Sequence, residues 1–413
     1  MSADPRVTPL RTSILLGGRG VAGGVDGRGE PGSTWREAMM IGRVLPSGSG
    51  AGFRRDPSPI LERVLGLGVD EVLVRAEWAR LAPAEGVVDE AEVAWLSRLL
   101  TDLRHAGRRT GLVLTDGAVP SWMGPEAWLM PATPERLAIL ATELVAALDG
   151  LLDVVVPVEE PGAWCLGGWV AGASPPLRVG APSDAMAALD GMLAGLVLAE
   201  GALTSVAPDV EVAWLASPGL GQEAERAVLG LPGAGSRLER PVRSLARRSP
   251  GRTLQLRASG AGAASSAILP FGAGAPTPSA PLAAAVWRAA SEAAPLAATV
   301  PSALTSAPAS PVGLRMVHSS ATIDERGRVS RLRGHHRLAL LADALEAAAA
   351  HGGVNRLVMG EATDRWRLGS YRSREGVFGV DRTRGSVGYE VEAVDAAGID
   401  VAAGLASLLA EPR

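Results

Sequence analysis

Residues 153–161 read Asp-Val-Val-Val-Pro-Val-Glu-Glu-Pro, a short apolar run that ends in two carboxylates and a proline. A bounded valine-rich run of this length is typical of a strand that is buried inside a sheet. Barrel enzymes place their catalytic groups at the carboxyl ends of such strands. The run therefore predicts a strand that presents Glu159 and Glu160 at a functional edge.

The alternation of short apolar runs with longer helical stretches extends along the chain. We expect strands at Ser13 to Leu16, Glu71 to Ala76, Thr110 to Thr115, Asp153 to Val158, Val210 to Ala216, Thr253 to Arg257, Gly313 to His318 and Val354 to Gly360. We expect helices at Pro59 to Leu67, Glu90 to His105, Pro134 to Leu148, Ser183 to Val206 and His335 to Ala350. Eight strands alternating with helices predict an α/β fold, a single (β/α)8 TIM barrel that spans residues 1–413.

An open doubly wound sheet is the alternative, because it too alternates strands with helices. Such a sheet has a glycine-rich turn of fixed spacing after its first strand, and Gly17-Gly18-Arg19-Gly20 does not follow that spacing. Residues 260–311 are rich in alanine, serine and proline, which predicts long loops within the barrel and one helix around Ala283 to Ala290.

Composition excludes several classes of protein. A net charge of −4 without a basic stripe argues against nucleic acid as a partner. All 40 basic residues are arginine, so no lysine can form a Schiff base or act as a general base. The one cysteine, Cys165, excludes an intrachain disulfide and is interpreted as a packing residue. With no leader and no run of about 20 uninterrupted apolar residues, we expect a cytoplasmic protein without a membrane partner.

Several strand-end motifs carry a family resemblance. Leu67 to Asp70, leading into Arg75 to Pro83, looks like a Leu-Gly-Val run followed by Ser-Trp-x-Arg-x-x-Pro. Val158 to Pro161 is similar to Thr-Leu-Asn-Glu-Pro, and Gly376 to Asp381 to Phe-Gly-Leu-Val-Tyr-Val-Asp. Asp26 to Trp35 is similar to an N-terminal Glu-Gly…Gly-Arg-Gly-x-Ser-x-Trp stretch. In this order the motifs resemble glycoside hydrolase family 1, the β-glucosidase and β-galactosidase family.

The resemblance implies hydrolysis of O-glycosidic bonds by a retaining mechanism, in which two glutamates lie about 5 to 5.5 Å apart. Glu160 occupies the acid/base position. The family's Ile-Thr-Glu-Asn-Gly matches Met316 to Ser320, so His318 stands where the nucleophile should be. An imidazole cannot supply the negative charge that the nucleophile provides. The sequence is therefore interpreted as a divergent member with a degenerate active site.

The sugar-holding positions depart from the family in the same direction. Asp116 falls where the family has a histidine-tryptophan pair, Glu159 replaces its asparagine, and Arg257 falls near its Asn-Tyr pair. Hydrogen bonds to sugar hydroxyls depend on those amide and carboxylate groups. We expect a small glycoside or sugar-like ligand without a cofactor, bound by Asp116, Glu159, Trp164, Arg257, Glu361, Asp364 and Trp366.

Several functional interpretations remain. In the preferred one catalysis is lost, and the barrel is a pseudoenzyme that binds a glycoside-like or other small ligand, or a protein partner, at the former active-site face. In the alternative, Glu160 is a general acid and a water assisted by Asp116, Glu361 or Asp364 replaces the nucleophile, with inversion and carboxylates about 6.5 to 9.5 Å apart. His318 with two or three carboxylates could also coordinate a divalent metal, although no local ligand motif supports this. A novel reaction is the remaining possibility.

Purely structural roles compete with these interpretations. Adjacent strand residues face opposite sides, so Glu159 could pair with an arginine on a helix. His318 could be a hydrogen-bonded core histidine, and Trp164 could pack within its loop rather than against a sugar. Trp78 and Arg80 are assigned to structure.

Overall fold

The structure of the protein is a computed structural model. It describes residues 10–17, 32–40, 53–54, 56–170, 172, 174–213, 215, 252–256, 312–316, 321–323, 329–331, 338, 342, 345, 354–363, 377–378 and 401–410. The low-complexity stretch 260–311 and the helix expected around Ala283 to Ala290 lie outside the described residues.

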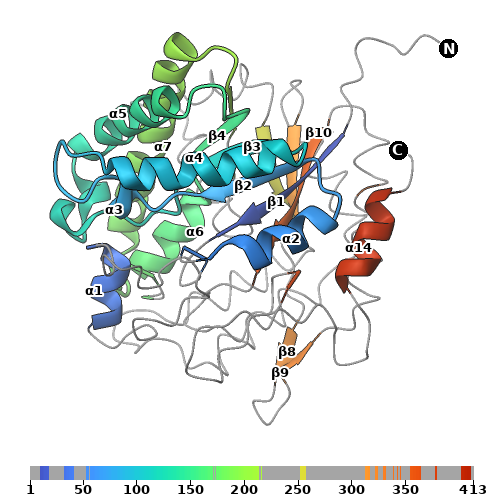
Figure 1. Ribbon diagram of the computed structural model, residues 1–413. Coiled ribbons are helices and arrows are strands. Elements are labelled where there is room, and N and C mark those ends of the chain that lie inside the picture. Colours follow the sequence, from blue (N-terminus) through green and yellow to red (C-terminus); the bar gives the residue numbers. More distant parts are fainter. Residues whose placement is uncertain are drawn as a thin grey trace.

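Within these residues, eight parallel strands form one sheet in the order β5-β4-β3-β2-β1-β10-β7-β6 (Figure 1). They are β1 (Arg11–Leu16), β2 (Glu71–Arg75), β3 (Arg109–Thr115), β4 (Val154–Val158), β5 (Glu211–Val212), β6 (Arg252–Leu256), β7 (Val312–Met316) and β10 (Val354–Glu361). Each overlaps one of the predicted strands. When the hairpin strands β8 and β9 are left out, hydrogen-bonded neighbours in the sheet are consecutive in sequence, and the last strand, β10, pairs with the first, β1. This order confirms the predicted (β/α)8 barrel over the doubly wound alternative, because consecutive strands of a barrel are neighbours.

A side chain that crosses the sheet shows that it is curled. Arg356 on β10 donates hydrogen bonds to Glu71 on β2 and to Glu211 on β5, at distances of 2.6 to 3.1 Å. β10 and β5 are far apart in the sheet order. One side chain can reach both only because the sheet bends round on itself, with Arg356 inside the curve.

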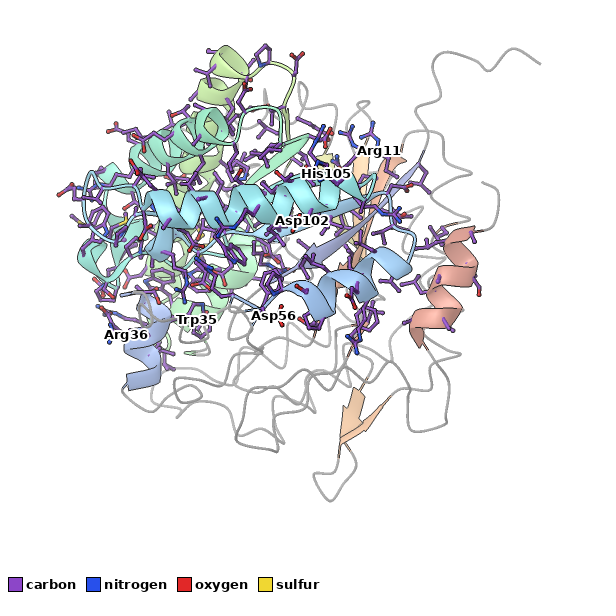
Figure 2. The ribbon with its side chains drawn as sticks, in the orientation of Figure 1. Arg11, Trp35, Arg36, Asp56, Asp102 and His105 are labelled. Atoms are coloured by element: carbon purple, nitrogen blue, oxygen red, sulfur yellow. The ribbon has the colours of Figure 1, made fainter. Side chains whose placement is uncertain are left out.

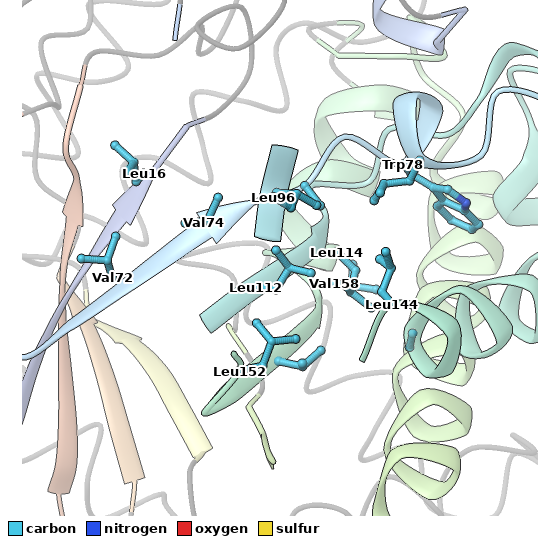
Figure 3. Close-up of a cluster of buried hydrophobic side chains, with 14 of the residues drawn as sticks. Leu16, Val72, Val74, Trp78, Leu96, Leu112, Leu114, Leu144, Leu152 and Val158 are labelled. Carbon is cyan, nitrogen blue, oxygen red and sulfur yellow. The ribbon is translucent and has the colours of Figure 1, made fainter. Parts of the chain in front are cut away.

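The core has two layers that follow from the alternation of side chains along each strand. Residues with the same orientation as Arg356 form a cluster inside the barrel: Leu15, Leu73, Val113, Val154, Val156, Ala213, Leu215 and Val358. Their strand neighbours Leu16, Val72, Val74, Leu112 and Leu114 belong to a larger cluster that includes the surrounding helices (Figure 3). Strands that are buried on both faces explain why the sequence shows continuous apolar runs.

Four predicted helices are confirmed with small shifts at their ends. They are α2 (Ser58–Gly66), α4 (Glu90–His105), α5 (Ala132–Ala147) and α7 (Pro182–Val206). The helix expected at His335 to Ala350 is described only at residues 338, 342 and 345, which are helical.

The remaining described elements were not predicted from the sequence. The helices among them are α1 (Thr34–Met40), α3 (Trp78–Leu81), α6 (Pro161–Cys165), the π-helix Leu166–Val170, the 3-10 helices Ser121–Met123 and Ala127–Leu129, and α14 (Val401–Ala410). The strands among them, β8 (Ala321–Ile323) and β9 (Val329–Arg331), form an antiparallel hairpin.

The helix α7 is unusually apolar. Among the described residues it contains the one segment, Ser183–Val206, that is long and apolar enough to cross a membrane, and an 18-residue stretch of it has a mean hydropathy of 1.5. In this structure 44% of that stretch is buried, and α7 packs beside α5 (Figure 1). Gly191 allows a close approach, since a Cβ there would lie 2.4 Å from the carbonyl oxygen of Trp128. The apolar residues of α7 therefore form a packing face of the barrel's outer layer.

Candidate functional site

The candidate site lies at the carboxyl ends of the strands, the edge at which barrel enzymes place their catalytic groups. In Figure 2, Arg11 marks the end of the barrel at which the strands begin, and Trp35 lies towards the end at which they finish. In the described part, the groups at the finishing edge include Gly17 after β1, Arg75 at the end of β2, Asp116 after β3, and Glu159 with Glu160 after β4.

Glu159 and Glu160 connect strand β4 to helix α6, and Glu160 is the residue at which the chain turns. Its backbone is left-handed, with φ 47° and ψ 53°, a region that non-glycine residues seldom occupy. Pro161 is the first residue of α6 and disfavours a right-handed helical conformation at the residue before it. The Glu160 N–H donates to the carbonyl of Leu215 at 2.9 Å, and its own carbonyl accepts from the N–H of Trp164 at 3.0 Å. Glu160 is 2% exposed, so a buried carboxylate stands on a strained backbone.

Glu159 is fully buried and bonded to an arginine. Arg75 donates from Nε to Glu159 Oε2 at 2.5 Å and from Nη2 to Oε1 at 2.7 Å. The third nitrogen, Nη1, donates to the carbonyl of Gly17 at 2.5 Å. Arg75 lies two residues after Leu73 and shares its inward orientation. The arginine partner considered for Glu159 is therefore present, but it lies on strand β2 inside the barrel and not on a helix.

The loop after β3 is packed against Trp164. Asp116 is half-buried, and its Oδ1 accepts a hydrogen bond from the N–H of Ala118 at 3.0 Å. Gly117 has φ +104°, and a Cβ there would lie 2.3 to 2.7 Å from ring atoms of Trp164. Trp164 is 2% exposed and makes an edge contact with Trp35 at 5.7 Å between ring centroids. This geometry favours a packing role for Trp164 among the loops. It does not favour the alternative role as an open platform for a sugar ring.

A second group of charges lies just beyond the end of β2. Arg80 donates from Nε to Glu77 Oε2 at 2.7 Å. Burial raises the pKa of the Glu77 carboxyl, and the charge of Arg80 acts against that increase. Trp78, between them, is 4% exposed and packs on Trp128 with 6.1 Å between ring centroids. These contacts agree with the structural roles expected of Trp78 and Arg80.

No protein-family model matches the sequence, and no curated protein matches it significantly. Solved structures, in contrast, match its fold. The AHE enzyme from Alicyclobacillus herbarius aligns over 99% of both chains with a TM-score of 0.68 and 17% identity. The β-glucosidase from Thermotoga maritima in complex with noeuromycin aligns over 98% of both chains with a TM-score of 0.70 and 13% identity. The β-glycosidase BGL167 aligns over 98% of this chain and 97% of its own with a TM-score of 0.65 and 20% identity.

The chain has the fold of the family 1 β-glucosidases. The whole length of the chain takes part in the match. The resemblance seen in the strand-end motifs is thereby confirmed at the level of fold. The roles of the individual site residues do not follow from the shared fold.

The family 1 fold brings together some of the predicted site residues. Asp116, Glu159, Glu160 and Trp164 all lie at the carboxyl edge. Glu361 is the last residue of β10, at the same edge, because it is in register with Leu15 of β1. Four of the predicted site residues lie outside the described residues: Arg257, His318, Asp364 and Trp366. Their roles at the carboxyl edge stay predictions. Among the described residues, no group of three or more histidine, cysteine, aspartate or glutamate side chains could hold a metal ion.

Arg75 and Gly17 are the contributors that sequence reasoning missed. A signal was present for the arginine: Glu71, Leu73 and Arg75 alternate along one strand, and the strand leads directly to the functional edge. Nothing in the sequence, however, indicated which of the arginines would meet Glu159, since the two residues are 84 positions apart.

Proposed function

We propose that this barrel binds a glycoside or a sugar-like small molecule at the carboxyl edge and does not hydrolyse it by the retaining mechanism. The fold supports the ligand class, because β-glucosidases of the same fold have been captured with noeuromycin and with castanospermine. The sequence supports the loss of retaining chemistry, because His318 stands at the nucleophile position of the family pattern.

The observation that carries the proposal is the ion pair between Arg75 and Glu159. Retaining hydrolysis needs a second carboxylate about 5 to 5.5 Å from the acid, free to form a bond with the sugar. Because His318 stands at the nucleophile position, another carboxylate near Glu160 would have to take that role, and Glu159 is the first candidate. Glu159 is adjacent to Glu160 in sequence, but both of its oxygens are bonded to one guanidinium. It is also a carboxylate where the family has an amide for a sugar hydroxyl. The residue next to the acid is thus committed to the protein and not to a sugar.

The proposal is tested with 4-nitrophenyl β-D-glucopyranoside as substrate and deoxynojirimycin as ligand. We expect no nitrophenol release above the blank from the wild type or from Glu160→Gln. We expect the wild type to bind deoxynojirimycin in a calorimetric titration, and Glu160→Gln to bind about tenfold more weakly because a charged acceptor is lost. Glu85→Gln is the matched control, since Glu85 is 67% exposed. Nitrophenol release that Glu160→Gln abolishes would contradict the proposal.

Inverting hydrolysis is the second candidate, and the burial of Glu160 favours it. A buried carboxyl group can act as a general acid, provided that a second carboxylate about 6.5 to 9.5 Å away activates a water. Asp116, Glu361 and Asp364 are the candidates for that second group. This function predicts turnover that Glu160→Gln abolishes and a first-formed product of inverted configuration.

A cytoplasmic location also stays a proposal. It is supported by the cysteine content, because a chain whose one cysteine is buried and free does not depend on disulfides.

A further inference from the structure

We propose that Arg75 is a positioning residue for the ligand site: by fixing Glu159, it holds Glu160 in the left-handed conformation that directs its carboxylate. This inference rests on the proposed function, in which Glu160 meets the ligand. It assigns a role to an arginine that does not itself need to touch the ligand.

The first step of the argument is that Arg75 ties three strand ends together. Its guanidinium binds both oxygens of Glu159 after β4 and the carbonyl of Gly17 after β1, while Arg75 itself ends β2. The side chains of Arg75 and Glu159 are 4% and 0% exposed. Water therefore does not compete for these bonds. The two hydrogen bonds from the buried Arg75 guanidinium set the position of the Glu159 carboxylate.

The second step is that Glu160 depends on its neighbours for its conformation. A left-handed glutamate persists only where the surroundings over-determine it. The Glu160 N–H is held by Leu215 and its carbonyl by Trp164, and the Glu159 N–H donates to the carbonyl of Thr115 at 2.9 Å. These bonds fix the peptide groups on both sides of Glu160. The side chain of Glu159 is a further anchor on the strand side, and Arg75 binds it.

The third step separates positioning from stability. A buried ion pair is weak evidence for a stabilising role, because apolar side chains of similar volume often serve as well. What a guanidinium adds is direction, since its planar group donates two parallel N–H···O bonds to a carboxylate in one bidentate geometry. The pair at Arg75 and Glu159 thus specifies an orientation at the residue before Glu160.

The test replaces both partners, with Arg75→Leu combined with Glu159→Leu, so that no unpaired charge stays buried. The matched control combines Arg54→Leu with Glu92→Leu, which removes another ion pair of low exposure, 11% and 6%, on the outer side of the barrel. Thermal unfolding, titration with deoxynojirimycin and a crystal structure are measured for both double variants. A single variant, Arg75→Lys, keeps the charge without the fork.

We expect the Arg75 and Glu159 double variant to fold with a melting temperature near that of the control and to bind deoxynojirimycin at least tenfold more weakly than the control. We expect Arg75→Lys to lose affinity as well, because an ammonium group does not bind the carboxylate in the same bidentate geometry. Wild-type affinity in the double variant, with Glu160 still at φ near 47°, would overturn the inference.

The crystal structure keeps the inference separate from the proposed function. If the wild type binds neither deoxynojirimycin nor castanospermine, the proposed function fails. The backbone of Glu160 in the Arg75 and Glu159 double variant then decides: departure from the left-handed region supports positioning by Arg75, and an unchanged conformation overturns it.

Discussion

At the scale of single residues, Glu160 combines a functional position with backbone strain. It is the second of the two residues between β4 and α6, and the proline that follows restricts its backbone conformation. Strain of this kind is found at active sites and ligand clamps, where the surrounding structure holds it. The side chain at this position is therefore retained against a cost that glycine would avoid.

That cost predicts a difference between two variants that both lack the carboxylate. Glu160→Gly should be more stable than Glu160→Ala by about 1 kcal/mol, because alanine keeps the left-handed penalty and glycine does not. Urea unfolding measures the difference. At Glu143, an exposed residue of α5, the order should be reversed, since glycine is about 1 kcal/mol worse than alanine inside a helix. Equal stabilities at Glu160 would show that its backbone is not strained.

Part of the site was accessible from the sequence at this scale. The apolar run before Glu159 and Glu160 predicts their position at a strand end, and the alternation of strand residues allows an arginine partner for Glu159. The identity of that partner was not accessible, because Arg75 reaches Glu159 only through the curvature of the sheet. The burial of Trp164 was equally hidden, since it depends on a glycine at position 117 that admits the ring.

At the scale of elements, the long periodic helices and the strands of the sheet were predictable from the sequence, and the short helices were not. The bounds of α4 agree with the sequence expectation, Glu90 to His105, because apolar spacing runs its full length and Asp89 caps its start. Helix α1 has seven residues, too few to show a period. Its start is held instead by tertiary bonds, in which Thr34 and Val119 each donate a backbone N–H to the other.

The cap of α4 provides a second stability prediction. The side chain of Asp89 accepts hydrogen bonds from the N–H groups of Ala91 and Glu92 at 2.9 and 3.0 Å. Asp89→Ala should lower the free energy of unfolding by about 1 kcal/mol, whereas Asp89→Asn, which keeps an acceptor, should change it by a few tenths. Chemical denaturation of both variants is the measurement. An equal loss in the two variants would show that the cap bond is not the cause.

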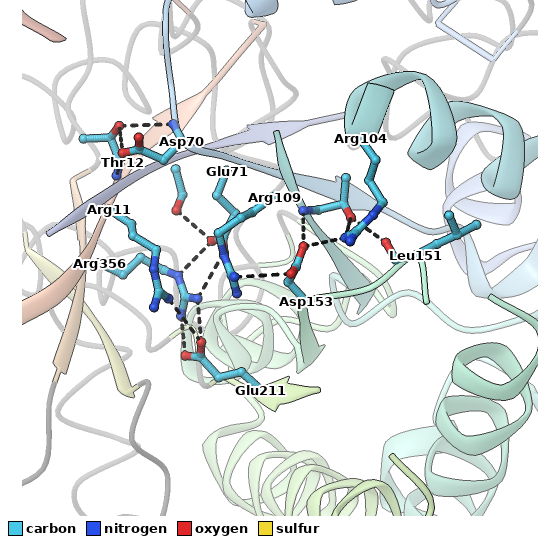
Figure 4. A network of polar contacts seen from close by, with 12 residues as sticks. Arg11, Thr12, Asp70, Glu71, Arg104, Arg109, Leu151, Asp153, Glu211 and Arg356 are labelled. Carbon is cyan, nitrogen blue, oxygen red and sulfur yellow. Dashed lines mark hydrogen bonds and ion pairs between the residues drawn. The ribbon is translucent and has the colours of Figure 1, made fainter. Parts of the chain in front are cut away.

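At the scale of the whole molecule, a charged network closes the end of the barrel opposite the candidate site. Arg356 crosses the interior to Glu71 and Glu211, and Arg109 connects Glu71 to Asp153 (Figure 4). This end of a barrel serves stability rather than catalysis, because the catalytic groups lie at the opposite end. The sequence predicted the barrel from its period but not this network, because its members lie on strands far apart in sequence.

The network makes stability depend on pH. Burial acts to raise the pKa of the Glu211 carboxyl, but hydrogen bonds and charge from Arg356 outweigh it, so the folded-state pKa lies below the ordinary 4.5. The unfolded chain therefore takes up the proton first as the pH falls. The stabilisation by Glu211 is complete above about pH 5 and is lost as the pH falls through the folded-state pKa.

Glu211→Gln tests this dependence. The variant should be less stable than the wild type by about 2 kcal/mol at neutral pH, because the buried Arg356 loses one of its two carboxylate partners and keeps only Glu71. Below pH 4.5 the difference should shrink. Glu85→Gln, which breaks an exposed pair with Arg136, should cost less than 1 kcal/mol. A difference between wild type and Glu211→Gln that stays constant from pH 7 to pH 3 would contradict the assignment.

The central claim is that a family 1 fold has kept a ligand site without retaining hydrolysis. Proton NMR of 4-nitrophenyl β-D-glucopyranoside in the presence of the protein tests it most directly, because one sample reports binding, turnover and product configuration. The account predicts saturation transfer from the protein to the sugar protons and no released glucose over a day. Glucose released first as the β-anomer would show retention and would contradict the account.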